Sequence, residues 1–486
     1  MQLRDRTREL TIAPLWRLGF RPFFLAGSAF ALLAIGLWIA HLLGYLPAWQ
    51  PAGGSLAWHR HEMPFGFGVA IVAGFLLTAV QNWTGRPGLS GRPLAALFGL
   101  WLLARLAWLT EVPLSLLLAV QLPFLPLLAG IIGRQLRAAG QRRNYPLVLV
   151  LLLMTGCEYL LLYGLALGDE TLQRRGALAG LWLLGALVSV IGGRVIPFFT
   201  QRGVGRISPY APQPRLDLLV MLLSLGAALS FALGHNLQPQ PWLAPLFLAL
   251  TLVHGLRLRH WYDDGIWRAP LLWSLHAAYA WLPLATLGLA LWHLGLLAQA
   301  SLGHHALAVG AVAGVILAML ARVSLGHTGR PLQAPRAMGW AFASLQLAAL
   351  LRVLLQAQQK GQLVDLGRVN TAGWMMHEEL WLQLTEFLEN EQIITRAQQG
   401  GYVLTRDLDE LDMADLLSRL PEPLPAVDKL PDRVEGDGAW YPPFLQALGR
   451  LEEERKRVLQ GSVKSWLGPD AGVPVATPLT EEKLDA

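Results

Sequence analysis

The histidines are the residues of this sequence best suited to chemistry, and several stand at the ends of apolar segments. Residues 58–63 read Trp-His-Arg-His-Glu-Met and lead into an apolar run over 62–82. Ionisable groups at the end of a membrane helix are costly unless they face water, a partner or a metal. His59 and His61 could ligate one metal together only from an irregular or extended turn, because on a helix they point about 200° apart. The alternative is an interfacial Trp-His belt without a ligand.

The same pattern returns 244 residues later in the chain. In both copies 23 residues separate a histidine from a Thr-Gly-Arg-Pro motif. We therefore expect a partial parallel internal repeat, as in membrane folds built by duplication. The matching parts are His61 with His305, Gly66 with Gly310, the motifs 84–87 with 328–331, and the flanking apolar runs 20–43 with 270–297 and 93–109 with 338–355.

Neutral imidazole is a good ligand for haem iron and for copper, which makes the histidines near the two ends of the repeat candidate ligands. Both copies cross the membrane in the same direction. Their histidines therefore lie at one membrane face, and their Thr-Gly-Arg-Pro motifs lie at the other. Two sites are possible, one on each face. A polar neighbour such as Glu62 or Asn82 could orient a ligating ring. The candidate metal ligands are His59, His61 and His305 on one face, and His276 and His327 on the other.

Three arginines next to glycines are candidates for pairing with the propionates of a haem. Arg86 and Arg330 belong to the Thr-Gly-Arg-Pro motifs, and Arg194 lies in Gly-Gly-Arg-Val-Ile-Pro at 192–197. We place Asn82 in the same cofactor-binding set. The structural alternative is that Gly-Arg-Pro ends a helix and the arginine reaches lipid phosphate.

The elements that must position these residues are long apolar helices. About 20 helical residues cross a bilayer core of about 30 Å, and runs near this length recur along the first 356 residues. We predict an all-α polytopic membrane protein of about eleven helices, because soluble cores do not repeat such runs without a charged face. The runs are 20–43, 62–82, 93–109, 112–132, 146–167, 177–197, 216–233, 242–256, 270–297, 304–322 and 338–355.

The distribution of charged residues predicts how the protein is oriented in the membrane and where the membrane part of the chain ends. Residues 1–356 hold 26 Arg, no Lys and 10 acidic residues, whereas residues 357–486 hold 13 basic and 23 acidic residues. Arginine clusters occupy alternate loops, which predicts a cytoplasmic N-terminus in the bacterial inner membrane, with the first helix retained as a span. Cys157 is the single cysteine, which excludes an internal disulfide, a cysteine-ligated zinc site and a four-thiolate iron–sulfur cluster.

Five segments of the membrane part have a distinctive combination of residues. They are Pro-Leu-Trp-Arg-Leu-Gly-Phe-Arg-Pro-Phe-Phe at 14–24, Trp-His-Arg-His-Glu-Met at 58–63, Asn-Trp-Thr-Gly-Arg-Pro at 82–87, Gly-Arg-Val-Ile-Pro at 193–197 and Arg-Val-Ser-Leu-Gly-His-Thr-Gly-Arg at 322–330. Through them, residues 11–350 resemble the NnrS family of membrane proteins. The resemblance implies a twelve-helix inner-membrane protein that binds haem and copper and is associated with bacterial nitric-oxide metabolism, nitrosative stress and denitrification. The twelfth helix is missing here.

The acidic tail after residue 356 resembles the soluble C-terminal extension of YihY-type membrane proteins, once labelled as ribonuclease BN. The resemblance rests on residues 355–359, a helix near 374–390, and 401–410. An amphipathic helix followed by a hairpin predicts a small α/β winged-helix-like module over 357–420. The tail's net charge of −10 repels phosphate, so we expect no nucleic-acid partner. Residues 421–486 are expected to hold a Pro-rich stretch, a charged helix and a disordered end.

Three functions remain open at this stage, and the sequence does not decide whether the protein is an enzyme. The first is a haem- and copper-binding protein of the nitric-oxide response, with nitric oxide as substrate or signal. The second is a secondary transporter in which Asn82, Arg194 and His276 line a polar path. The third is a membrane-tethered regulator that acts through the tail. Eleven spans from a cytoplasmic N-terminus would place that tail outside, whereas the extension it resembles would be cytoplasmic.

Overall fold

The computed structural model describes residues 11–358 except 47 and 298, residues 378–396 and 402–404, and the single positions 446, 449, 450, 453 and 457. The chain divides into two compact units, Met1–Gln358 and Gln359–Ala486, which we name the membrane unit and the C-terminal unit. Each is described by itself.

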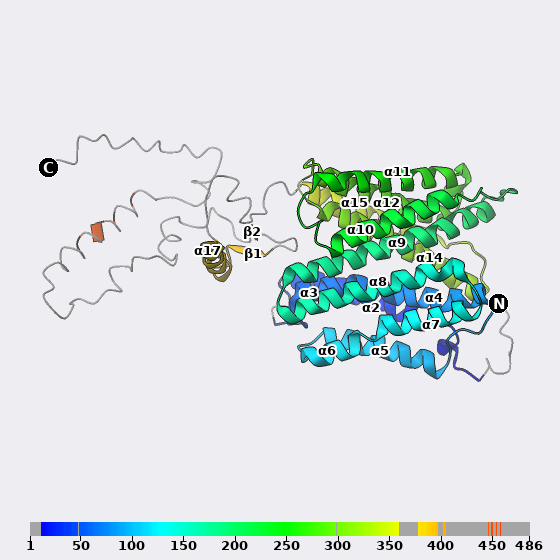
Figure 1. The fold of residues 1–486 in the computed structure, drawn as a ribbon, viewed down its shortest axis with the longest axis horizontal. Helices are drawn as coiled ribbons and strands as arrows, with labels where there is room; N and C mark the ends of the chain where they lie inside the picture. Colours follow the sequence, from blue (N-terminus) through cyan, green and yellow to red (C-terminus); the bar gives the residue numbers. More distant parts are fainter. Residues whose placement is uncertain are drawn as a thin grey trace. The chain divides into compact units, whose positions relative to one another are not determined.

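Long helices make up the membrane unit, and Figure 1 shows them side by side with nearly parallel axes. The first nine helical segments are α2 (Phe20–Leu42), α3 (Gly54–His61), the π-helical η2 (Glu62–Gly68), α4 (Val69–Thr84), α5 (Arg92–Trp108), α6 (Leu114–Gln121), α7 (Phe124–Ala138), α8 (Tyr145–Leu167) and α9 (Glu170–Gly203). The later ones are α10 (Pro214–Ala232), α11 (Ala244–Trp261), α12 (Pro270–His293), α13 (Ser301–His305), the π-helical η6 (Ala306–Ala313), α14 (Gly314–His327) and α15 (Arg336–Gln358). Short 3-10 turns lie at Pro14–Trp16, Arg142–Asn144, Pro241–Leu243 and Asp264–Arg268.

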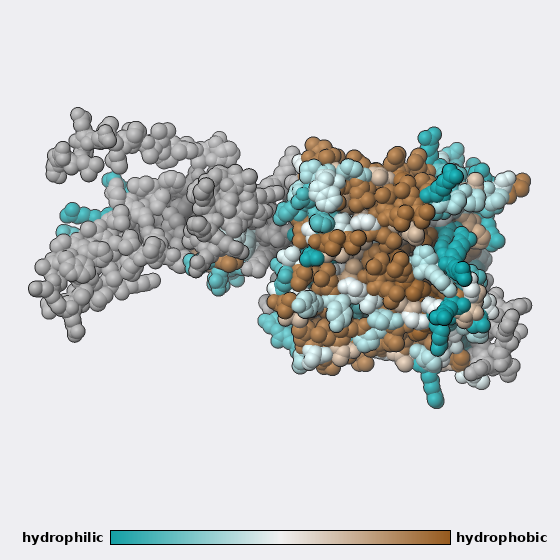
Figure 2. Space-filling view, viewed as in Figure 1, coloured by the Kyte–Doolittle hydropathy of each residue, from teal (hydrophilic) through white to brown (hydrophobic). Residues whose placement is uncertain are grey.

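The lengths and surface of these helices confirm a polytopic all-α membrane protein. Within the described part of the chain, ten helical stretches are long and apolar enough to cross a bilayer. The remaining predicted run, 93–109, forms α5, which has 17 residues. Many large apolar side chains face outward, and Figure 2 shows an apolar band over the helices with hydrophilic residues gathered toward the end where α2 begins. Helices satisfy their own backbone hydrogen bonds, so such a surface is stable in lipid.

Small residues set the closest helix contact, between α8 and α9. Gly176 and Gly180 are four residues apart on α9, as in the small-residue motifs of membrane helix pairs. A Cβ atom on Gly176 would lie 2.4 Å from the carbonyl oxygen of Cys157 and 2.5 Å from the backbone nitrogen of Leu161. Gly180 admits the ring of Phe65 from η2 in the same way. Only glycine lets the two backbones approach so closely.

The internal repeat is present in the fold. His61 is the last residue of α3 and His305 is the last residue of α13, and each is followed by a π-helical segment and then a longer α-helix. Packing is repeated as well, because α2 contacts η2 and α4 while α12 contacts η6 and α14. The helices α5 and α15 begin at Arg92 and Arg336, again 244 residues apart, and contact η2 and η6 respectively.

Both Thr-Gly-Arg-Pro motifs end a helix. Gly85 follows α4 with φ of +63°, and Gly329 lies just after α14 with φ of +69°. The left-handed backbone at such a position favours glycine, and the proline that follows cannot continue the helix. These motifs therefore have a sufficient structural reason in the helix ends themselves.

In the C-terminal unit, α17 (Glu378–Asn390) is followed by an antiparallel pair of strands, β1 (Ile394–Arg396) and β2 (Tyr402–Leu404). The rings of Trp381 and Tyr402 lie 5.7 Å apart, so the helix packs on the hairpin. The predicted helix and hairpin are thus present, and the winged-helix-like module stays a prediction. The run 405–410, the Pro-rich stretch from 421 and the end of the chain to 486 lie outside the described residues.

Candidate functional site

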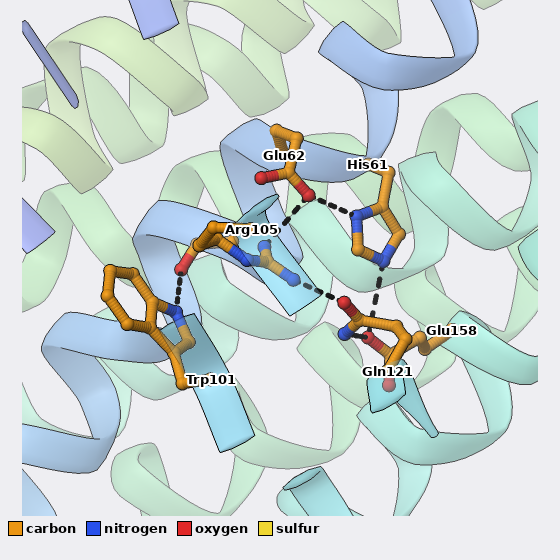
Figure 3. A network of polar contacts seen from close by, with 7 residues as sticks. His61, Glu62, Trp101, Arg105, Gln121 and Glu158 are labelled. Carbon is orange, nitrogen blue, oxygen red and sulfur yellow. Dashed lines mark hydrogen bonds and ion pairs between the residues drawn. The ribbon is translucent and has the colours of Figure 1, made fainter. Parts of the chain in front are cut away.

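A closed ring of five side chains lies buried among α3, η2, α5, α6 and α8 (Figure 3). We name it the buried ring; none of its members is more than 2% exposed. Glu62 Oε1 lies 2.8 Å from both His61 Nδ1 and Arg105 Nη1. Arg105 Nη2 also donates to the Gln121 carbonyl, and Gln121 Nε2 donates to Glu158 Oε1 at 2.5 Å. His61 Nε2 closes the ring 3.3 Å from the same oxygen of Glu158.

Hydrogen bonds at both nitrogens of His61 would need one proton beyond those of a neutral imidazole and two carboxylates. Both ring nitrogens of His61 face carboxylate oxygens, and a neutral imidazole has a single N–H. The second contact is a hydrogen bond only when the imidazole is cationic or when one carboxyl group is protonated. Either arrangement offsets the charge of Arg105, which makes the ring electrically neutral in a low-dielectric interior.

Local sequence explains why the ring forms at η2. A Cβ on Gly66 would lie 2.3 Å from Arg105 Nη1, so glycine here admits the guanidinium. The carbonyl oxygen of Gly66 accepts a hydrogen bond of 3.0 Å from Trp101 Nε1. Pro64 lies within η2 and has no backbone N–H for a helical hydrogen bond. The ring of Trp108 stacks on His61 with centroids 4.2 Å apart.

Sequence reasoning named His61 and proposed Glu62 as an orienting partner, and the two are in contact. It did not single out Arg105, Gln121 or Glu158. A signal was available, because Arg105 and Glu158 each stand inside an apolar run where an unpaired charge would be costly. Their partner could not be read from the sequence, since 97 residues separate His61 from Glu158.

A second group of histidines lies in α3 and α13, the short helices that precede the two π-helical segments. We name His59, His304 and His305 the histidine group. His59 stacks on Trp38 with centroids 4.2 Å apart, and its Nδ1 is buried without a hydrogen-bond partner. His304 Nδ1 lies 3.3 Å from Trp182 Nε1, while its Nε2 is also buried and unpartnered. His59 and His304 each interact electrostatically with His305, so members from the two repeat copies lie near one another.

The donors of the histidine group fit a haem or a copper ion better than a metal enclosed by protein ligands alone. The lone pair of a buried imidazole nitrogen suits copper and haem iron, and His59 Nδ1 is buried without a hydrogen-bond partner. Over residues 11–358 and the other described positions, no three His, Cys, Asp or Glu side chains are close enough to surround a metal. Haem iron needs only one or two protein ligands, because the porphyrin supplies four.

His59 and His61 do not share a site. Both belong to α3, which is a regular helix, and they face different neighbours. His59 lies against Trp38 of α2, and His61 points into the buried ring. A metal on His61 would have to replace one of its two carboxylate contacts, whereas a metal on His59 would meet an unused nitrogen.

His276 and His327 lie toward the other end of the bundle and contact different elements. His276 is buried with Nδ1 3.1 Å from the carbonyl oxygen of Leu272 and Nε2 3.3 Å from that of Trp261. His327 stacks on Phe20 with centroids 5.0 Å apart. Neither residue therefore offers the buried, unpartnered nitrogen that His59 and His304 do.

The four predicted cofactor-binding residues are also far from the histidine group. Asn82, Arg86 and Arg330 are exposed, and 23 helical residues, about 35 Å, separate His61 from the Thr-Gly-Arg-Pro end of α4. Arg194 Nη1 donates to Asn144 Oδ1 at 2.6 Å, which ties α9 to the turn before α8. A cofactor held by His59 or His305 would not reach these side chains.

A second buried polar network joins α9, α10, α11 and α12. Arg257 donates to Asp217 Oδ1 at 3.0 Å, to Ser189 Oγ at 3.0 Å and to the Tyr279 hydroxyl at 2.9 Å. His254 Nδ1 lies 3.0 Å from the same hydroxyl. Gly193 makes room, because a Cβ there would lie 1.7 Å from Arg257 Nη2. Packing against Arg257 therefore accounts for the glycine before Arg194 without a cofactor.

His254 and His293 are two further buried histidines. His293 accepts from the backbone nitrogen of Gln240 at 3.0 Å and donates from Nε2 to Asn236 Oδ1 at 2.8 Å. Partners from distant segments satisfy each ring, which periodicity cannot reveal.

Part of the chain is related to curated membrane proteins. A UPF0761 membrane protein of Azotobacter vinelandii is 42% identical over 130 residues, 27% of this chain and 31% of that protein. One of Pseudomonas aeruginosa strain PAO1 is 43% identical over 121 residues, 25% of this chain and 29% of that protein. This chain thus spans less than a third of these relatives' length, consistent with the YihY-type resemblance of its C-terminal portion.

No solved structure matches the chain. The model of the NnrS protein family matches residues 14–385, which include the whole described membrane unit after Ala13. The match takes in α3, η2, α13 and η6 with their histidines, and the repeated architecture around them. The chain is a multi-pass membrane protein that belongs to the NnrS family.

Proposed function

We propose that this protein binds haem and copper in the bacterial inner membrane and acts in the nitric-oxide response, with its N-terminus in the cytoplasm. Family membership supports the setting. The observation that carries the proposal is the histidine group, in which two buried imidazole nitrogens, one from each repeat copy, have no hydrogen-bond partner. An unpaired buried polar atom is costly, which favours a ligand on it.

The roles follow from the contacts of each side chain. His59 offers Nδ1 beside the ring of Trp38. His304 would offer Nε2 only after its hydrogen moves to Nδ1, because the indole N–H of Trp182 donates to Nδ1. His305 is the third candidate ligand, and His61, His276 and His327 are weaker candidates because of their existing contacts. When bound, a haem iron supplies a coordination position for a diatomic ligand such as nitric oxide. The protein contributes orientation and a water-poor surrounding.

The test is an optical spectrum with metal analysis of the full chain purified in detergent. We expect a haem absorbance band and bound copper. Replacing His59, His304 or His305 singly by alanine should reduce the haem or copper content per protein. Absence of both haem and copper from the purified protein would refute the proposal.

The matched control for these variants is His235→Ala. His235 is an exposed histidine with a ring contact to Trp242, and its replacement should leave haem and copper content unchanged. Unchanged content in all three histidine-group variants would reject the ligand assignment even if the wild-type protein carries both cofactors.

A secondary transporter is the second candidate, favoured by the Arg257 network. Asp217 is half exposed at the start of α10, and the contacts from it lead through Arg257 and Tyr279 to fully buried His254. Buried polar chains of this kind mark ion pathways in membrane proteins. Substrate flux in proteoliposomes made from metal-free protein would favour this function over the first.

For the C-terminal region we propose a winged-helix-like module over 357–420 that contacts protein rather than nucleic acid. Its support is the helix–hairpin pair of α17, β1 and β2 and the acidic balance of the region. A gel-shift assay with DNA and RNA should show no binding. Specific retention of either nucleic acid at physiological salt would contradict the proposal.

A further inference from the structure

Each copy of the repeat has one arginine in contact with a residue at or just before the start of its π-helical segment. In the first copy Arg105 of α5 contacts Glu62, the first residue of η2. In the second copy Arg352 of α15 contacts His305, the residue just before η6. The helices α5 and α15 are repeat counterparts, but the two arginines are not at equivalent positions, because Arg105 corresponds to Ala349. Arg352 corresponds to Trp108, which stacks on His61, the counterpart of His305.

The first arginine is fixed by an acid. Arg105 pairs with Glu62 at 2.8 Å and also donates to Gln121, and all three are buried. The position that corresponds to Glu62, 244 residues on, is Ala306. The second copy therefore has neither the carboxylate nor the arginine of this pair at the equivalent positions, which hold Ala306 and Ala349.

Arg352 instead donates to an imidazole. Its Nη2 lies 3.1 Å from His305 Nε2, and a guanidinium has no acceptor, so Nε2 must supply its lone pair. His305 Nδ1 lies 2.9 Å from the carbonyl oxygen of Ser301, to which only an N–H can bond. His305 is thus held as the neutral tautomer with hydrogen on Nδ1 and with the metal-binding lone pair of Nε2 directed at Arg352.

We propose that Arg352 is a displaceable cap on the metal site, which copper removes when it binds to His305 Nε2. This inference rests on the proposed function. One lone pair cannot serve both a guanidinium hydrogen and a metal. The cationic guanidinium, which also interacts electrostatically with His59, opposes the approach of a metal cation to the histidine group.

The location of Arg352 allows its side chain to move away from His305. It is half-buried on α15, a helix whose membrane face is largely open to lipid, whereas Arg105 lies fully enclosed. A long arginine side chain near the end of a membrane helix can extend its charged group to the interface while its stem stays in lipid. Displacement of Arg352 therefore needs no rearrangement of the helices.

The test measures Cu(I) affinity of the full chain by competition with a chromophoric chelator. Arg352→Met keeps the stem and removes the charge and the donor. In wild type, copper must break the charged hydrogen bond between Arg352 and His305. Removal of this bond should therefore raise the Cu(I) affinity by roughly tenfold to a hundredfold. Arg352→Lys, which keeps the charge, should stay closer to wild type. Arg336→Gln, at the exposed start of the same helix, is the control and should change nothing.

A double variant separates the cap from other effects. In Arg352→Met combined with His305→Ala, the gain in affinity should vanish, because the freed lone pair is gone. Unchanged or weaker Cu(I) binding in Arg352→Met, with an unfolding temperature and elution volume like those of wild type, would overturn the cap. If Arg352→Met does not fold, the same comparison with Arg352→Gln decides.

The result also distinguishes this inference from the proposed function. Copper binding by wild type that is insensitive to Arg352 refutes the cap alone. Absence of copper binding in wild type and every variant refutes both. Binding that occurs only after Arg352 is replaced would show that copper cannot displace this arginine, and would overturn the displaceable cap.

Discussion

Arg105 and Glu62 form an ion pair of 2.8 Å in which neither side chain is more than 2% exposed, and it joins the helix α5 to the π-helical segment η2. Charges this deep in a membrane unit are costly unless they are paired. Gln121 and His61 add contacts to this pair from two further elements, while Glu62 Oε2 and Arg105 Nε are buried without a hydrogen-bond partner.

Removing one member of this pair should destabilise the membrane unit strongly. In Arg105→Met, Glu62 loses its buried cation, and we expect a loss of about 3–5 kcal/mol in the free energy of unfolding. Unfolding in mixed detergent micelles, followed by tryptophan fluorescence, measures it. The control Glu170→Gln breaks the partly exposed pair with Arg60 and should cost about 0–1 kcal/mol. Equal effects of the two changes would contradict a special role of burial.

The closest approach of α8 and α9 should tolerate no added methyl group. In Gly176→Ala the new Cβ meets backbone atoms of Cys157 and Leu161, so the helices must separate, at a cost of about 1–3 kcal/mol. Gly156→Ala on α8 is the matched control, since its Cβ meets nothing within 4 Å. Thermal unfolding of both variants in the same detergent gives the comparison, and a stable Gly176→Ala would show that the contact is looser than described.

The hydroxyl of Tyr279 should matter for stability rather than for cofactor content. Tyr279→Phe removes the shared partner of Arg257 and His254, and an unsatisfied buried donor costs about 1–3 kcal/mol. Tyr159→Phe, on an exposed tyrosine, should change the free energy of unfolding by less than about 0.5 kcal/mol. Haem or copper loss in Tyr279→Phe with unchanged stability would assign this network to the cofactor instead.

Trp182 should oppose metal binding at His304 Nε2. Its indole N–H donates to His304 Nδ1 at 3.3 Å, so the neutral ring carries its hydrogen on Nε2. A metal can take Nε2 only after that hydrogen moves to Nδ1, where it would face the indole N–H. Trp182→Phe removes this conflict and should strengthen copper binding in a titration, with Trp267→Phe, an exposed tryptophan, as the control. Weaker binding in Trp182→Phe, or equal affinities of the two variants, would contradict this role of the indole.

The membrane unit should fold without the C-terminal unit. The division of the chain falls after Gln358, at the end of α15, so ending the chain there removes no helix of the membrane unit. We expect an unchanged elution volume and unfolding temperature in detergent. Aggregation of the shortened chain would show that the tail stabilises the helices.

The sequence by itself determined the membrane architecture, the repeat and the tail boundary. Apolar runs of near-bilayer length are local properties, so the helices could be counted before the fold was known. The repeat was visible because the spacing from His61 to Thr84 recurs from His305 to Thr328. The helix and hairpin after residue 377 followed from amphipathicity and a glycine turn, which are also local.

Only the tertiary structure decided what each histidine contacts. His59 and His61 lie two residues apart on one helix, yet one faces Trp38 and the other a ring closed by Glu158 from α8. His254 and His293 are satisfied by Tyr279 and Asn236, which come from other segments of the chain. A polar group in lipid is stable only with a partner that satisfies it, and that partner is chosen by helix packing in three dimensions rather than by spacing along the chain.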